Sequence, residues 1–227
     1  MSYTKIAFEN MSNAVNKIQK DTIHDNDFTN ILKYLNVMIE VKESITLKND
    51  SIGQLWNEII YDILSSIHSA SCGFYRSAIV VLRSILELGC NSFFYYDHII
   101  EYTIYQNENI KADKYVSTLV NDYDFFKTKY IKAFFCNIEQ KQDKEDSVSD
   151  YLKSLYGTLS DIVHGRYKSL IKSNGLEVKY EKDYFKRYES LFFRTLSILA
   201  VMYILRIENT SNPDLSELAN YIKVVEL

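Results

Sequence analysis

The chain has 227 residues, of which 47% are hydrophobic and 25% are charged, a balance that excludes a disordered or fibrous protein. Proline occurs once and glycine six times, so the chain lacks the turn residues that a many-stranded sandwich or barrel needs. The formal net charge of −4 excludes the molecule-wide basic field of a nonspecific nucleic-acid binder, so an RNA site must be local.

Apolar residues recur at helical spacing along most of the chain. In chain order, the predicted helices cover residues 3–19, a segment that starts after Asp27, residues 53–70, 74–96, 111–138, a segment that ends at His164, residues 183–209 and a short segment after Pro213. Ser69 to Gly73 offers a break between the third and fourth helices, and Gly165 supplies a C-terminal stop after His164.

The predicted fold is therefore all-α, an up-and-down helical bundle. One short β-hairpin near residues 170–180 is the single exception, because Asn174-Gly175 is a hairpin turn signal. No repeat, low-complexity tract or linker divides the chain, so we expect one helical domain over residues 1–227. Its parts are an N-terminal helical layer (1–50), a core bundle (53–209) and a C-terminal helix (213–227).

Cysteine usage and hydropathy favour a cytoplasmic protein that binds no membrane. Cys72, Cys90 and Cys136 are an odd number of thiols far apart, without a CxxC or Cys/His pair, which indicates reduced cysteines. The first residues do not resemble a secretory signal. The longest apolar run, Leu196 to Leu205, is shorter than the ~20 residues that cross a bilayer. No metal or cofactor motif is found, and we expect neither group.

Two arginines and a glutamate form a charged stripe on the predicted helix 74–96. At about 100° per residue, Arg76, Arg83 and Glu87 lie close together on a helix that is otherwise apolar. Because a buried charge costs several kcal/mol unless it is paired, Arg83 and Glu87 are expected to satisfy each other and a further group. The stripe is either an ion pair that fixes helix register or the polar wall of a cleft.

A second polar set lies on the helix that ends at His164. Gly157, Ser160, Asp161 and His164 lie on one side of its apolar stripe, whose members are Leu152, Leu155, Tyr156, Leu159, Ile162 and Val163. A glycine within a helix costs ~1 kcal/mol relative to alanine, so Gly157 predicts close approach by another helix or by a partner subunit. His164 is either a last-turn cation that favours the helix dipole or a functional group. We predict that four polar side chains converge, because each needs a polar partner in a closed bundle. They are Arg83, Glu87, Asp161 and His164.

Together these segments resemble the HEPN superfamily, over about residues 60 to 205. The matching residues are Ala78, Leu82-Arg83, Leu86-Glu87 and Val163-His164-Gly165. The resemblance implies an up-and-down bundle, usually a homodimer, found in bacterial phage-defence and toxin–antitoxin systems. It also implies a protein partner from the same operon, and many members of the superfamily are metal-independent ribonucleases.

The chain departs from the ribonuclease pattern, because no arginine stands four to six residues before His164. Arg83 or Arg166 is the candidate for the missing cation, and the candidate catalytic set is His164, Arg83, Arg166, Glu87 and Asp161. In the implied reaction a ribose 2′-hydroxyl attacks its own phosphate, assisted by His164 and an arginine. Residues 166–187 carry seven basic and three acidic residues, which suits RNA. The alternative is a noncatalytic module that binds a partner protein or nucleic acid.

Overall fold

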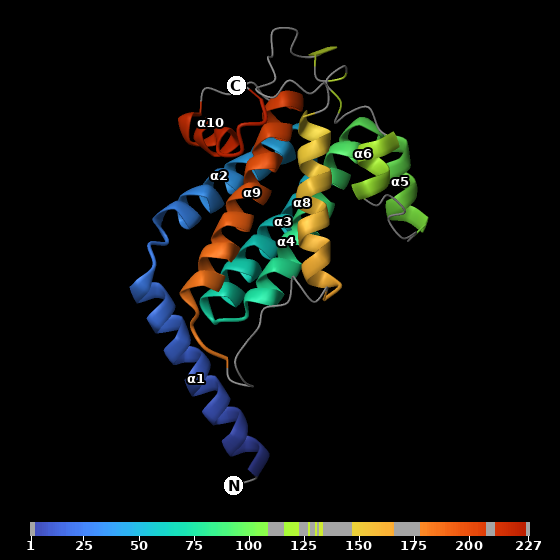
Figure 1. Cartoon of the computed structure of the whole chain (residues 1–227). Helices are drawn as coiled ribbons and strands as arrows, with labels where there is room; N and C mark the ends of the chain where they lie inside the picture. Colours follow the sequence, from blue (N-terminus) through green and yellow to red (C-terminus); the bar gives the residue numbers. More distant parts are fainter. Residues whose placement is uncertain are drawn as a thin grey trace.

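The computed structural model describes residues 3–108, 116–122, 127, 130, 132–133, 147–165, 178–207 and 212–225. These residues form helices without any strand, which confirms the all-α prediction for the described part of the chain (Figure 1). The helices are α1 (Tyr3–Asp25), α2 (Thr29–Lys48), α3 (Asp50–Ser71), α4 (Tyr75–Asp97), α5 (Ile99–Glu108), α6 (Val116–Asp122), α8 (Ser147–Val163), α9 (Lys182–Arg206) and α10 (Pro213–Asn220).

Helix α9 forms the centre of the hydrophobic core. Every residue from Thr195 to Leu205 is buried, and α2, α4, α8 and α10 all pack against this helix. Its buried hydroxyl groups are satisfied by backbone carbonyls: Ser197 donates to Ala219 O at 3.1 Å, and Thr195 donates to Leu191 O at 2.8 Å. The apolar run of this helix is therefore enclosed by protein on all sides.

Cross-helix hydrogen bonds fix the direction of α3 relative to α4. Ser66 Oγ donates to Ala78 O at 3.0 Å, and Trp56 Nε1 donates to Ser92 Oγ at 3.1 Å. Residue numbers fall along one helix as they rise along the other, so the two helices are antiparallel. The turn between them contains Gly73 at a φ of 82°, a conformation that glycine adopts without strain. The predicted break after Ser69 is thus confirmed.

The start of α4 contacts the start of α9, and the end of α4 contacts the end of α9, so these helices run parallel. At the start, the backbone N–H of Glu181 donates to the Tyr75 hydroxyl at 3.1 Å. At the end, Arg206 Nε donates to Asp97 Oδ1 at 2.9 Å, and this carboxylate also accepts from the Tyr130 hydroxyl. Because the Asp97 and Arg206 side chains are only 12% and 19% exposed, the pair holds the far ends of both helices together.

Helix α1 departs from the expected N-terminal layer. It projects away from the other helices in Figure 1, and its residues are absent from the described hydrophobic cluster. Ile18 and Thr22 near its C-terminal end are buried, whereas Phe8 is 65% exposed and Met11 51% exposed. Helical spacing predicted the helix correctly, but only its last turns are covered by the rest of the chain.

Helix α10 begins with a side-chain cap. Asn212 Oδ1 accepts from the backbone N–H groups of Asp214 and Leu215, at 2.9 and 3.2 Å. Pro213 stands at the first helical position, where a missing N–H costs nothing and the fixed φ suits a helix. The short helix predicted after Pro213 is confirmed, and Leu215 and Leu218 on its inner side are buried.

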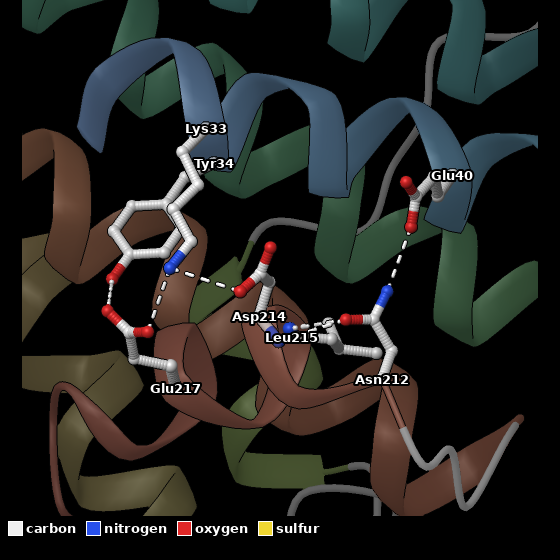
Figure 2. A network of polar contacts seen from close by, with 7 residues as sticks. All are labelled: Lys33, Tyr34, Glu40, Asn212, Asp214, Leu215 and Glu217. Carbon is white, nitrogen blue, oxygen red and sulfur yellow. Dashed lines mark hydrogen bonds and ion pairs between the residues drawn. The ribbon is translucent and has the colours of Figure 1, made fainter. Parts of the chain in front are cut away.

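Polar contacts hold α10 against α2, as Figure 2 shows. Lys33 Nζ lies 2.8 Å from Glu217 Oε2, and the Tyr34 hydroxyl donates to the other oxygen of Glu217 at 2.8 Å. Burial and the bond to Glu217 raise the pKa of Tyr34 to about 12. Asn212 Nδ2 donates to Glu40 at 2.8 Å, so the cap of α10 is itself tied to α2.

Helices α4 and α9 are long and apolar enough to cross a membrane by length and composition alone. In their most apolar stretches, however, 61% and 83% of the residues are buried within the fold, and the two helices pack against each other. Their hydrophobicity is thus accounted for by the core.

Three differences from the sequence predictions concern the middle of the chain. Helix α5 was not predicted and begins directly after His98. Of the long helix predicted over 111–138, the structure describes α6 and a few further residues. The predicted hairpin falls largely outside the described residues, and residues 178–180 form no strand.

Two glycines within helices give a matched test of packing. A Cβ atom added to Gly157 meets no atom within 4 Å, whereas one added to Gly53 lies 2.9 Å from Thr46 Cα on α2. We expect Gly157→Ala to raise the free energy of unfolding by about 0.5–1 kcal/mol through helix propensity. Gly53→Ala should lower it by about 1–3 kcal/mol because α2 and α3 must separate. Urea denaturation measures both, and equal effects would contradict the described packing.

Candidate functional site

The candidate site is the seam between α4 and α8, the two helices that carry the predicted residues. The apolar side of α8, with Leu152, Leu155 and Leu159, is fully buried. The opposite side of this helix faces solvent at Lys153, Gly157 and His164. The charged stripe of α4 lies beside the boundary between these two sides of α8.

A three-residue network joins the helices across the middle of the seam. Arg83 Nη2 donates to the Tyr156 hydroxyl at 2.8 Å and forms an ion pair with Glu87 Oε1 at 3.0 Å. The Tyr156 hydroxyl in turn donates to Glu87 Oε1 at 3.1 Å. The guanidinium also lies over the Tyr156 ring, 5.1 Å from its centroid. The prediction that Arg83 and Glu87 pair with each other and with a further group is confirmed.

The network is a partly buried charge system. The Arg83 side chain is 19% exposed and that of Glu87 34% exposed. Burial by itself lowers the pKa of Arg83, but the hydrogen bond from Arg83 to Tyr156 and the charge of Glu87 outweigh it and raise the pKa. Among the described residues, Arg83 Nε is buried without a hydrogen-bond partner. Tyr156 is the residue of α8 that bonds to both members of the pair.

The other end of the seam is open and holds His164. Helix α8 ends at Val163, and the backbone N–H of His164 donates to Ser160 O at 2.9 Å. Gly165 follows at a φ of 65°, the left-handed conformation predicted for a helix stop. The His164 side chain is exposed. At the same end, Arg76 Nη2 donates to Val163 O at 3.2 Å.

The predicted site residues share one seam but do not form a single cluster. His164 lies eight residues beyond Tyr156, which is about 12 Å along a helix axis. No hydrogen bond or ion pair between described residues joins His164 to Arg83 or Glu87. Asp161 is half-buried, about 140° around α8 from Tyr156. Arg166 lies outside the described residues.

Two residues of the seam were absent from the predicted site. Tyr156 was assigned to the apolar stripe, although its hydroxyl connects both charged groups of α4. Its position at the edge of that stripe was the available signal, because a buried tyrosine hydroxyl usually finds a partner. Arg76 was assigned to the charged stripe but not to the site, and it is the arginine that reaches the end of α8.

Gly157 has no close neighbour among the described residues, so none of the described helices makes the expected close approach. The glycine lies on the exposed side of α8. The other alternative, approach by a partner subunit, stays a prediction.

No group of three or more His, Cys, Asp or Glu side chains able to hold a metal ion occurs in the described part of the chain. His68 Nε2 and Cys72 Sγ lie 3.8 Å apart at the end of α3, without a third such group among the described residues. A hollow lies between α2, α9 and α10, lined mainly by Val37, Val41, Tyr203 and Leu215. Its one carboxylate, Glu40, already accepts from Asn212. The α4/α8 seam is therefore the stronger candidate.

Comparison of the chain with protein-family models, curated proteins and solved structures finds no match. The resemblance to the HEPN superfamily thus stays a prediction from sequence motifs, and the roles of individual residues must be argued from their geometry.

Tyr156→Phe tests whether the hydroxyl holds the seam together. Its loss leaves Arg83 and Glu87 without their shared partner, so the free energy of unfolding should fall by about 1–2 kcal/mol. The matched control is Tyr61→Phe on α3, whose side chain is 69% exposed and should change stability by less than about 0.5 kcal/mol. Equal small effects in chemical denaturation would show that the network contributes nothing to stability.

Proposed function

We propose that this chain is a HEPN-like protein of a bacterial phage-defence or toxin–antitoxin system that cleaves RNA in the cytoplasm without a metal ion. The observation that carries the proposal is the packing of α4 against α8. Arg76 and Arg83 contact Val163 and Tyr156 across the seam, and His164 directly follows Val163. Residues that are 87 and 73 positions apart in the sequence thereby belong to one surface.

The helix directions support the proposed up-and-down bundle. Helices α3 and α4 are antiparallel, and α4 and α8 are antiparallel because Arg76 meets Val163 while Arg83 meets Tyr156. Helix α9 runs parallel to α4. Alternation of direction along the chain is what an up-and-down topology requires.

In the proposed reaction, the ribose 2′-oxygen attacks the adjacent phosphorus while the bond from phosphorus to the 5′-oxygen breaks. The products are a 2′,3′-cyclic phosphate and a 5′-hydroxyl group. His164 either takes the proton from the 2′-hydroxyl or gives one to the leaving 5′-oxygen. Its exposure at the end of α8 leaves room for a nucleic-acid strand.

The alternative is a noncatalytic interaction module that binds RNA or a protein partner from the same operon. It is favoured by the state of Arg83, whose charge is already paired with Glu87 and Tyr156. It is also favoured by the absence of an arginine four to six residues before His164. In this alternative the seam fixes helix register, and the surface around His164 binds without chemistry.

His164→Ala separates the two functions. The exposed side chain can be removed without loss of core packing, so the variant should keep the thermal stability of the wild type. Cleavage of single-stranded RNA in excess EDTA should fall at least about 100-fold, as expected for loss of a general acid or base. The products should carry a cyclic phosphate. Undiminished cleavage by folded His164→Ala would reject the catalytic role, and no cleavage by the wild type would favour the noncatalytic module.

We also propose that the chain forms a homodimer through the small-residue face of α8 that Gly157, Ser160 and Asp161 form. Gly157 leaves open space there, and Val80 on the neighbouring α4 is 39% exposed. A small residue allows a second helix backbone to approach closely, which explains why a glycine that costs helix stability stands at this position.

Gly157→Arg is the corresponding test. The open space around this position accepts a long side chain in the monomer, so the variant should fold but should not dimerise. Light scattering at micromolar concentration should report a dimer for the wild type and for Gly157→Ala, and a monomer for Gly157→Arg. A wild-type protein that is monomeric over the whole range would contradict the proposal.

A further inference from the structure

Near His164, the described surface contains an arginine that forms no ion pair with a described carboxylate. Arg76 is exposed, and its single described contact is the hydrogen bond from Nη2 to Val163 O. A guanidinium has five N–H donors in a fixed plane, so most of them stay available beside His164. This arrangement differs from that of Arg83, which lies two helical turns deeper along the seam.

Arg83 is poorly suited to bind an anion. Its side chain is 19% exposed, and its charge faces the carboxylate of Glu87 at 3.0 Å. A phosphate that approached Arg83 would have to displace the Tyr156 hydroxyl and would be repelled by Glu87. The energetic cost of that exchange would reduce any gain from the new contact.

We propose that Arg76 is the phosphate-binding side chain of this surface, and that it holds one phosphodiester of a single-stranded RNA next to the imidazole of His164. The inference rests on the proposed function and deepens it, because it names the cation that the sequence pattern lacks. Arginine suits this role, since its planar fork donates two parallel hydrogen bonds to phosphate oxygens.

The position of Arg76 at the end of α8 strengthens this assignment. The last carbonyl groups of a helix carry partial negative charge, which disfavours an anion nearby. Arg76 donates to one of these carbonyls, at Val163, and so offsets that field where His164 begins. Removal of Arg76 would therefore weaken the binding of an anion in two ways. The hydrogen-bond donors would be lost, and the negative end of the helix would no longer be offset.

The composition of the following segment is compatible with a polyanion. Residues 166–187 carry seven basic and three acidic side chains, and they begin two positions after His164. This charge attracts any nucleic acid, whereas Arg76 and His164 are proposed to fix one phosphate in register.

The test uses the full chain and a fluorescent single-stranded 2′-O-methyl RNA, which lacks the hydroxyl group needed for the proposed cleavage. Fluorescence anisotropy over a range of salt concentrations should show that Arg76→Ala weakens binding about 10-fold. It should also lower the slope of log K against log salt by about one, the effect of a single phosphate contact. Arg76→Lys keeps the positive charge but loses the planar guanidinium and its paired donors, so this variant should bind with intermediate affinity.

The matched control is Lys153→Ala, which removes one exposed charge from α8 about 16 Å from His164 along the axis. It should leave affinity within about two-fold of the wild type if binding depends on position rather than on net charge. Equal losses in Arg76→Ala and Lys153→Ala would overturn the inference. So would full affinity in Arg76→Ala, or no binding by the wild type.

Parallel cleavage assays with unmodified RNA keep this inference separate from the ribonuclease proposal. Loss of binding in Arg76→Ala without cleavage by the wild type would support the phosphate site and reject the enzyme. Cleavage that depends on His164, combined with unchanged binding in Arg76→Ala, would support the enzyme and reject the phosphate site.

Discussion

The burial of the Arg83 guanidinium between two largely apolar helices sets the geometry of the α4/α8 seam. A charge in this position costs several kcal/mol unless it is paired and hydrogen-bonded. Glu87, one turn along α4, supplies the opposite charge, and Tyr156 on α8 supplies a hydroxyl that bonds to both. A shift of α8 by one residue would rotate Tyr156 by about 100° and leave both charges without this partner. The network therefore specifies one register between the helices.

That register also determines which residues of α4 and α8 meet two helical turns away. Arg76 precedes Arg83 by seven residues, and Val163 follows Tyr156 by seven residues. In an antiparallel pair, equal spacings bring the second pair of positions into contact once the first pair is fixed. The bond from Arg76 to Val163 O is the observed result. The partly buried network thus places an exposed arginine at the carbonyl that precedes His164, without contacting His164 itself. The two arginines of one stripe therefore have different surroundings.

Sequence patterns predicted much of the fold but less of the site. Apolar periodicity and the stops at Gly73 and Gly165 identified most of the described helices, because these signals are local. Periodicity gives the apolar side of a helix but not what covers it, so the exposure of Phe8 and Met11 on α1 was not predicted. Tyr156 was counted as apolar for a similar reason. Its polar role depends on Arg83, a residue far away in the sequence.

The same reasoning limits how Arg83 can take part in chemistry. In the free protein its charge is matched by Glu87, so an added phosphate would leave two anionic groups around one guanidinium. A transition state gains most from a cation that is not already neutralised and needs no rearrangement. Arg76 meets that condition, since its described partner is a neutral carbonyl rather than a carboxylate. An anion site built in this way requires no chemistry at His164, so it suits a noncatalytic RNA-binding module as well as a ribonuclease. What would make the surface catalytic is the distance between the bound phosphate and the imidazole, which the register of α4 against α8 controls.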